Sequence, residues 1–293
     1  SRKEPDEDEL RRLFEELEFR TLIDRVLKTN KTTASPTPQV SQPDLFGFFA
    51  DNGTDDSKNS SLKRLNDKDV DYQLVDTEAK EDELLQLILT RDNFALDTET
   101  TGTDPISAEL VGMSFSFAEN QAFYVPVPSN RDEAQKLVDK FKPAFENESS
   151  LKIGQNIKYD ILVLANYGVE VKGPMFDTMV AHYVLQPELH HGMDYLAEVY
   201  LKYDTIKIEE LIGAKGKNQK NMRDLSPEEV YKYACEDADV TFKLKNILEK
   251  ELSTSGVDKL FYEIEMPLVP VLAYMERNGV RIDTEALKET SRH

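Results

Sequence analysis

One short stretch, residues 94–102, constrains the fold of this chain most. An apolar run of strand type, Phe94 to Leu96, leads directly into Asp97 and Glu99 and then into a Thr/Gly turn. Because successive side chains of a strand point to opposite faces, these two carboxylates emerge on the same face, roughly 6–7 Å apart. Such a pair suits a hard divalent cation. In a chain with 56 acidic residues the pair alone also occurs by chance, so the rest of the sequence must decide.

Composition bounds the class of protein. With 293 residues, 39% hydrophobic and 31% charged, the chain can build one sizeable core plus appendages, or two small domains. No run approaches the ~20 apolar residues that span a bilayer, and the amino end has no apolar signal core, so we expect a cytoplasmic protein without a membrane partner. The single cysteine, Cys235, excludes an internal disulfide and a cysteine-based zinc site. A net charge of −20 argues against non-specific nucleic-acid binding unless basic patches or metal ions reverse it locally.

Four parts follow one another along the chain. Residues 1–28 place apolar side chains at helical intervals, whereas residues 29–69 have the Pro, Ser, Asn and Asp content of a linker. Residues 70–255 are patterned as a compact domain. Residues 256–293 hold an amphipathic helix closed by Gly279 and then the start of another at Asp283, an ending typical of a fragment.

The compact domain is predicted to be α/β, with a mixed five-stranded sheet flanked by helices. Short connections between the first three strands indicate an antiparallel meander, and the later strands alternate with helices. The predicted strands are residues 94–99, 110–117, 122–126, 151–153 and 169–171, and residues 71–75 are a candidate for a short opening strand. The predicted helices are residues 77–90, 132–145 and 157–167, one that begins at the N-cap Asp177, and one with a capping box at Ser226 and Glu229.

One segment is basic within this acidic chain. Residues 212–223 include two glycines and no acidic residue, together with Lys215, Lys217, Lys220 and Arg223. The segment is either a mobile, solvated surface loop or a flexible arm that contacts a phosphate backbone, and we favour the arm.

Two pairs of polar residues lie at helical spacing. Asn156 and Asp160 are four apart at a helix start, and Tyr233 and Asp237 are four apart on a later helix, so each pair shares a helix face. Taken singly, a mid-helix Asp is more often solvated surface and a Tyr more often a packing residue.

The order of these motifs carries a resemblance. Asp97-x-Glu99, then Asp160 after Gln155-Asn156, then Tyr233-x-x-x-Asp237, together resemble the proofreading exonucleases of the DEDD superfamily, tyrosine subclass. The residues of these motifs are similar to those of family A bacterial DNA polymerases. Residues 16–20 are similar to the segment after that family's 5′-nuclease region, and residues 263–279 to the first helix of its polymerase domain.

The resemblance implies a ribonuclease H-like fold for about residues 70–255 and hydrolysis of single-stranded DNA 3′ ends to nucleoside monophosphates, in replication and repair. It implies two divalent ions, Mg²⁺ or Mn²⁺, with Zn²⁺ as an alternative in one site. Asp97 would bridge both ions, Glu99 and Asp237 would complete the tighter site, and Asp160 would hold the second ion through waters. Tyr233 would orient the attacking water, since a phenol with a pKa near 10 is a poor base at neutral pH.

Substrate contacts follow from the same resemblance. Thr100, Gln155 and Asn156 would contact the terminal nucleotide. One departure is Thr103, which stands where relatives place an apolar residue against the terminal base. No polymerase activity is expected from this fragment.

The linker contains an apolar island, residues 42–49. Gln42-Pro43-Asp44-Leu45-Phe46 is similar to the peptide by which bacterial polymerases dock on the sliding clamp, with Pro43 where an apolar residue is usual. Gln42, Leu45 and Phe46 would enter the clamp. The alternative is docking on the chain's own globular part.

Two other functions compete with the nuclease. One is a catalytically silent domain that braces a polymerase and binds DNA, and the other is a free-standing RNA-trimming exonuclease of the same superfamily. Retention of all four carboxylates and Tyr233 favours activity over the first, and the polymerase-like residues 260–279 speak against the second.

Overall fold

The computed structural model describes residues 62–66, 68–216 and 218–292. The helices expected within residues 1–28, the proposed clamp residues Gln42, Leu45 and Phe46, and Lys217 of the basic segment lie outside these ranges. No helix among the described residues is long and apolar enough to cross a membrane.

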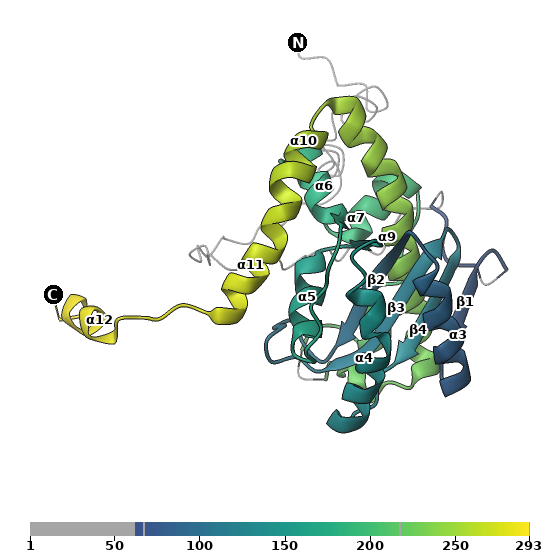
Figure 1. Ribbon diagram of the computed structural model, residues 1–293, viewed down its shortest axis with the longest axis horizontal. Helices are drawn as coiled ribbons and strands as arrows, with labels where there is room; N and C mark the ends of the chain where they lie inside the picture. Colours follow the sequence, from purple (N-terminus) through teal and green to yellow (C-terminus); the bar gives the residue numbers. More distant parts are fainter. Residues whose placement is uncertain (1–61, 67, 217, 293) are drawn as a thin grey trace, which may run out of the picture. The chain divides into compact units, whose positions relative to one another are not determined.

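A mixed six-stranded sheet forms the centre of the fold, in the order β1-β4-β3-β2-β5-β6 (Figure 1). Strands β2, β3 and β4 pair antiparallel, as the short connections predicted, and the remaining pairs are parallel. The strands are β1 (Asp71–Leu74), β2 (Asn93–Thr100), β3 (Leu110–Ala118), β4 (Gln121–Pro126), β5 (Leu151–Gly154) and β6 (Met175–Asp177). The predicted α/β class, with a mixed sheet flanked by helices, is confirmed.

The sheet has six strands and not the predicted five, because the candidate opening strand forms, as β1, and pairs with β4. One predicted strand is misplaced. Residues 169–171, predicted as the last strand, are not a strand, and that position is taken by β6, which pairs with β5. Val169 and Val171 are both buried in the core, so their alternating pattern reflects packing rather than pairing. The chain then turns at Gly173, whose φ of +82° favours glycine, before it enters β6.

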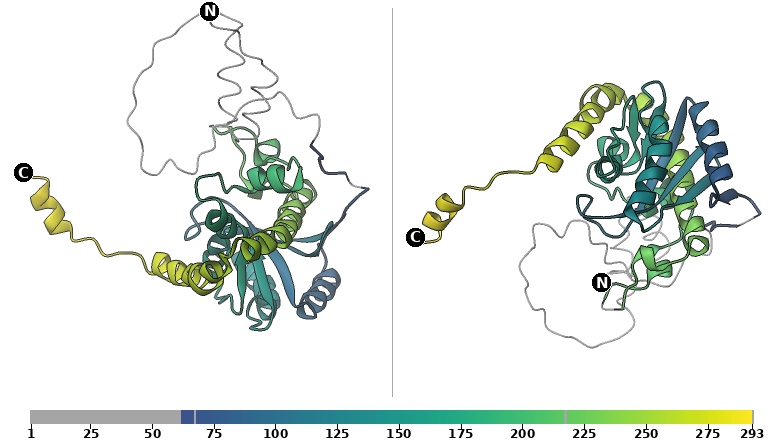
Figure 2. Two further views of the ribbon diagram at one scale, coloured as in Figure 1. Left: turned by 90° about the horizontal axis from the view of Figure 1, so that it is seen from above. Right: turned by 60° about the horizontal axis from the view of Figure 1, so that its bottom comes forward.

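Helices cover both faces of the sheet (Figures 1 and 2). On one face, α3 (Glu78–Leu89), α4 (Arg131–Phe145) and the end of α5 (Ile157–Ala165) pack on Phe94 and Leu96. On the other, α6 (Thr178–Leu185) and the long α9 (Pro227–Ser255) pack on Ala95. The alternation of β2 thus directs neighbouring residues into different layers, which decides where its polar end residues point.

The remaining elements connect and extend these layers. They are α7 (Met193–Leu196), the π-helix η2 (Ala197–Leu201), α8 (Ile208–Ile212), the 3₁₀-helix η3 (Met222–Asp224), α10 (Asp258–Leu260), the π-helix η4 (Phe261–Glu265), α11 (Met266–Asn278) and α12 (Thr284–Thr290). Phe261 packs in the α9 layer, and Asp283 caps α12 as predicted.

Local signals placed the starts of α6 and α9 correctly, whereas α5 ends at Ala165, two residues before the predicted end. Asp177 accepts hydrogen bonds from the backbone of Met179 and Val180 at the start of α6. At the start of α9, Ser226 and Glu229 form the predicted capping box, with Pro227 in the first turn. These caps fix the starting points of two of the helices around the site.

Candidate metal centre

Three carboxylates from two elements meet at one point. Asp97 and Glu99 leave β2 on the face that α9 covers, and Asp237 reaches them from α9, so that one oxygen of each lies within 4.8 Å of the others. Among the described residues this is the only group of three or more such side chains close enough to hold a metal ion. Oxygen-only ligands of this kind are those that Mg²⁺ and Mn²⁺ prefer.

Asp160 approaches the same place from the other layer. It lies in the first turn of α5, is only 3% exposed, and accepts a 2.6 Å hydrogen bond from the hydroxyl of Thr98 through Oδ1. Burial, and then the charge of Asp97, raises the pKa of Asp160. Asp160 is therefore at the edge of the three-carboxylate group, not within it.

The electrostatics of the group are unfavourable without a cation. Burial raises the pKa of Asp97 to about 6. Burial and the neighbouring carboxylates hold the pKa values of Glu99, Asp160 and Asp237 well above their usual range. One oxygen of Glu99, Oε1, is buried without a hydrogen-bond partner. An unpaired buried acceptor beside other acids is what a divalent ion would relieve.

Tyr233 belongs to the same cluster. It lies one helical turn before Asp237 on α9, and its hydroxyl hydrogen-bonds that carboxylate. Burial, then the charges of Asp237, Glu99 and Asp97, hold the pKa of its phenol well above the usual value. The phenol is therefore protonated at neutral pH and can donate a hydrogen bond.

The residues before α5 are held firmly. Asn156 adopts a left-handed conformation with φ of +62°. The amide of Gln155 donates to the carbonyl of His191 at 2.7 Å and accepts from the hydroxyl of Thr178. The side-chain amide of Gln155 is thus already committed within the protein, so any contact with a nucleotide shares those bonds.

Thr100 is the last residue of β2, and Thr103 lies in the turn that follows it. The Thr100 hydroxyl contacts the Tyr159 hydroxyl and lies 2.9 Å from the carbonyl oxygen of Gly102. Thr103 is exposed. The turn after the carboxylates is therefore tied to the first turn of α5.

The basic segment divides into two kinds of residue. Lys215 and Lys220 are exposed. Arg223 instead donates from its guanidinium to the carbonyl oxygens of Val127, at 2.5 Å, and Leu110. The placement of Arg223 in a free basic arm is corrected, because its charge is used to join η3 to β3 and to the residue after β4.

The supporting role of Thr98 was not predicted from the sequence, and that of Asp177 was predicted only in part. Thr98 lies between the two carboxylates of β2, and strand alternation alone would have put its hydroxyl in the α5 layer. Asp177 was expected as the cap of α6, but it also accepts from the backbone of Asn156, at 3.1 Å, and Ile157, at 2.8 Å. One buried carboxylate therefore fixes the starts of α5 and α6 together.

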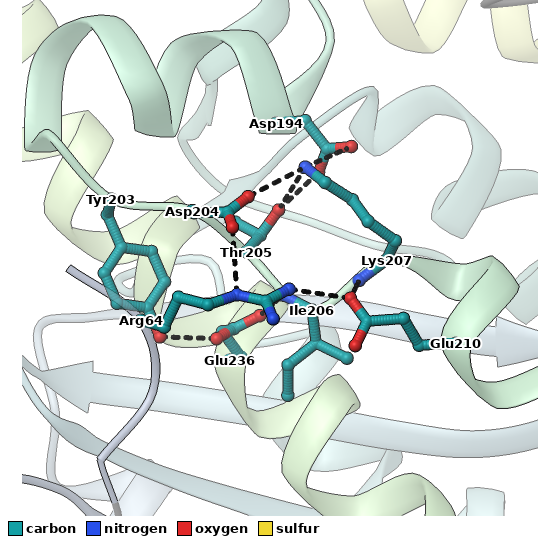
Figure 3. Close-up of polar contacts among 9 residues, drawn as sticks. All are labelled: Arg64, Asp194, Tyr203, Asp204, Thr205, Ile206, Lys207, Glu210 and Glu236. Atoms are coloured by element: carbon teal, nitrogen blue, oxygen red, sulfur yellow. Dashed lines mark hydrogen bonds and ion pairs between the residues drawn. The ribbon is translucent and has the colours of Figure 1, made fainter. Parts of the chain in front are cut away.

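A second buried acid lies next to Asp237. Glu236 is fully buried and accepts from the Tyr203 hydroxyl and, at 2.6 Å, from the backbone of Ile206 (Figure 3). Around it, Arg64 pairs with Asp204 at 2.9 Å and with Glu210 at 2.7 Å. This network ties the segment before β1 and the chain after η2 to α9.

Comparison with known proteins identifies the fold. Residues 72–253 match the model of a family described as 3′-5′ exonuclease. The chain belongs to this exonuclease family. The match includes all six strands except Asp71 of β1, the helices on both faces of the sheet, and α9 up to residue 253.

Its curated relatives are bacterial DNA polymerases. The exonuclease chain is 35% identical over 266 residues to DNA polymerase I of Borreliella burgdorferi, covering 90% of this chain and 28% of the relative. It is 35% identical over 299 residues to DNA polymerase I of Pseudomonas aeruginosa, covering 99% of this chain and 30% of the relative. The exonuclease chain thus spans about 30% of the length of these relatives.

Solved structures share the fold at low identity. Brucella melitensis NrnC with bound Mg²⁺ has a TM-score of 0.55 and 21% identity, covering 72% of this chain and 94% of that one. The POL domain of Pol1 from M. smegmatis, in complex with DNA primer-template and dNTP, has a TM-score of 0.59 and 17% identity, covering 74% and 34%. These likenesses support the ribonuclease H-like fold of exonucleases.

Proposed function

We propose that this chain is an active proofreading exonuclease segment of a bacterial DNA polymerase I. It removes nucleoside monophosphates from single-stranded DNA 3′ ends with the help of two divalent cations, Mg²⁺ or Mn²⁺. The single observation that carries the proposal is the meeting of Asp97, Glu99 and Asp237 within 4.8 Å, with one oxygen of Glu99 left unpaired. A silent bracing domain would have no need to keep these mutually repelling acids together.

The carboxylates fit such ions by their chemistry. Asp97, Glu99 and Asp237 would hold one cation, and Asp97 with Asp160 would hold the other. When bound, a pair of divalent ions neutralises charge on the phosphodiester and lowers the pKa of the attacking water. The protein's part is to keep the carboxylates rigid on β2, α5 and α9, so that little reorganisation is needed during reaction.

Tyr233 has a separate task. Its raised pKa keeps the phenol protonated, and its hydrogen bond to Asp237 fixes the direction of the ring. The hydroxyl would orient the water for attack in line with the leaving 3′ oxygen. A protonated phenol favours this orienting role over general-base catalysis at neutral pH.

Substrate would be held around this centre. Thr100, Gln155 and Asn156 would meet the terminal nucleotide, and the exposed Lys215 and Lys220, with Lys217, would meet phosphates further along the strand. Residues 1–28 would follow a 5′-nuclease region, and residues 256–293 would begin a polymerase domain.

A partner surface is proposed in the linker. Gln42, Leu45 and Phe46 would dock on the sliding clamp. Pull-down with purified clamp is expected to lose this chain after Leu45→Ala with Phe46→Ala, and unchanged recovery would rule the contact out.

The deciding experiment follows release of label from a 3′-labelled DNA strand. We expect release with Mg²⁺ or Mn²⁺, none in EDTA, and a loss of at least about 10³-fold in Asp97→Ala, since removal of one member of a catalytic group removes most of its effect. A matched RNA strand should be degraded more slowly. Absence of release by the wild type with either metal, or full activity in Asp97→Ala, would contradict the proposal.

A further inference from the structure

We propose that Thr98 is a positioning residue that orients the carboxylate of Asp160 toward the second cation of the centre. The inference rests on the proposed two-metal function and assigns a role to the one residue of the Asp97–Glu99 stretch whose side chain enters the other layer. It is carried by the path of β2 and by a single buried hydrogen bond.

The path of β2 directs Thr98 away from Asp97 and Glu99, toward the layer that holds α5. Asp97 and Glu99 face α9, which supplies Asp237. Thr98, between them, faces the opposite layer, where α5 supplies Asp160. Three consecutive residues of one strand therefore contact acidic residues from both layers.

The contact itself is short and enclosed. Thr98 Oγ1 donates to Asp160 Oδ1 at 2.6 Å, and the two side chains' residues are 8% and 3% exposed. In the described part of the chain, Thr98 is the only side chain that hydrogen-bonds to the Asp160 carboxylate. The bond occupies Oδ1, and Oδ2 would be the atom that meets a cation or its water.

The backbone that carries Asp160 is already fixed. Asp177 accepts hydrogen bonds from the backbone of Asn156 and Ile157 and so sets where α5 begins. The remaining freedom of Asp160 is rotation of its own side chain. Asp97 and Glu99 repel it, and a carboxylate with free torsions would turn away from them before an ion arrives. The Thr98 hydroxyl opposes that rotation.

Packing alone does not explain a hydroxyl at this position. Val has nearly the same shape and is equally suited to a buried strand. Thr241 on α9 shows the contrasting case, because it is fully buried and its hydroxyl has no partner. Loss of the hydroxyl at Thr98 removes a hydrogen bond, whereas loss of the hydroxyl at Thr241 removes none. Thr241→Val is therefore a matched control.

The test measures ion binding directly. Mn²⁺ is titrated by calorimetry into wild type, Thr98→Val, Thr98→Ser and Thr241→Val, after EDTA treatment and dialysis. We expect two ions in the wild type. In Thr98→Val the weaker ion should bind about 10–100-fold less tightly, as found when a partner of a metal ligand is removed, with the tighter ion unchanged. Thr98→Ser should bind within about threefold of wild type, and Thr241→Val should match wild type.

Hydrolysis gives a second readout. In Thr98→Val the turnover number should fall and recover as Mn²⁺ is raised, while KM for the DNA strand stays the same. In an Asp160→Asn background the Thr98→Val change should have no further effect, because the carboxylate it orients is gone. If Thr98→Val fails to fold, Thr98→Ser and Thr98→Cys provide the same comparison, since a thiol is the weaker donor.

The outcomes separate the two proposals. Wild-type affinity for both ions in folded Thr98→Val, or equal losses in Thr98→Ser and Thr98→Val, would overturn the role of Thr98 and leave the nuclease intact. A wild type that binds two ions but does not hydrolyse DNA would overturn the proposed function alone. A wild type that binds fewer than two ions would overturn both.

Discussion

Glu236 and Asp237 are consecutive acids on α9 with opposite surroundings. Glu236 is fully buried, and its two oxygens accept from Tyr203 and Ile206 (Figure 3). Asp237 is 8% exposed and shares its space with two other carboxylates, one of which has an unpaired oxygen. Two residues later, Asp239 repeats the first pattern, because it accepts from the Tyr72 hydroxyl and the Asn120 backbone, each at 2.7 Å.

The difference shows that buried acids are not equivalent. Glu236 and Asp239 are compensated by donors from the protein, so burial makes them structural. The acids around Asp237 instead crowd one another, and one oxygen of Glu99 has no donor, so that this group needs positive charge nearby. A site for cations is therefore recognised by missing donors as well as by its acidic residues.

The largest effect should come from removing the charge of Asp237, the member of the pair that lies among other carboxylates. Asp237→Asn is expected to lower the rate of 3′ nucleotide release at least about 10³-fold, because a ligand charge is lost. Its thermal midpoint in EDTA should not fall, because a repelling charge is lost too. Single-turnover release and thermal unfolding measure both. A large fall in midpoint would show that Asp237 is structural.

Glu236, whose two oxygens both accept hydrogen bonds from the protein, should respond in the opposite way. Glu236→Gln turns one acceptor into a donor that faces the Ile206 N–H or the Tyr203 hydroxyl, so we expect the free energy of unfolding to fall by about 1–3 kcal/mol. Nucleotide release should stay within about threefold of wild type. Urea unfolding and the release assay check the two halves. Loss of activity without loss of stability would reverse the comparison.

A third test uses the raised pKa of Asp97, which is about 6. Because the unfolded carboxyl titrates near pH 3.9, the folded chain binds the proton more strongly between about pH 4 and 6, so stability falls as pH rises through that window and then levels off. Asp97→Asn should therefore gain about 2 kcal/mol on wild type from pH 4 to pH 7 in EDTA. Urea unfolding at each pH measures the gain. If the free energy of unfolding depends on pH equally in the two proteins, the raised pKa of Asp97 is contradicted.

The local parts of the fold were predictable because they depend on nearby residues. The meander, the Asp177 cap and the capping box at Ser226 were all found from spacing and residue type. The edge strand was misplaced because Val169 and Val171 alternate like a strand while both are buried in the core. Such burial is a tertiary effect that periodicity cannot separate from pairing.

The site was predictable in the same uneven way. Alternation and helical spacing gave the shared faces of Asp97 with Glu99 and of Tyr233 with Asp237, and the family resemblance joined them. The use of Arg223 could not be foreseen, because its acceptors are backbone carbonyls far away in the chain. Thr98 escaped notice because its partner lies 62 residues away on a crossover helix.

The smallest effect concerns the basic segment. Lys215 and Lys220 are exposed, whereas Arg223 is committed to carbonyl oxygens. Each Lys→Ala change should weaken binding of a single strand severalfold and reduce the slope of log affinity against log salt by about 0.7 per lost phosphate contact. Arg223→Ala should instead lower the thermal midpoint. Fluorescence anisotropy at several salt concentrations, beside thermal unfolding, separates the two, and an unchanged slope in the Lys variants would remove them from the DNA path.

The most direct measurement of the central claim is anomalous diffraction from crystals of this chain soaked in Mn²⁺. The account predicts one peak enclosed by Asp97, Glu99 and Asp237 and a second between Asp97 and Asp160. Absence of any peak beside Asp97 at saturating Mn²⁺, with the carboxylates still gathered, would contradict it.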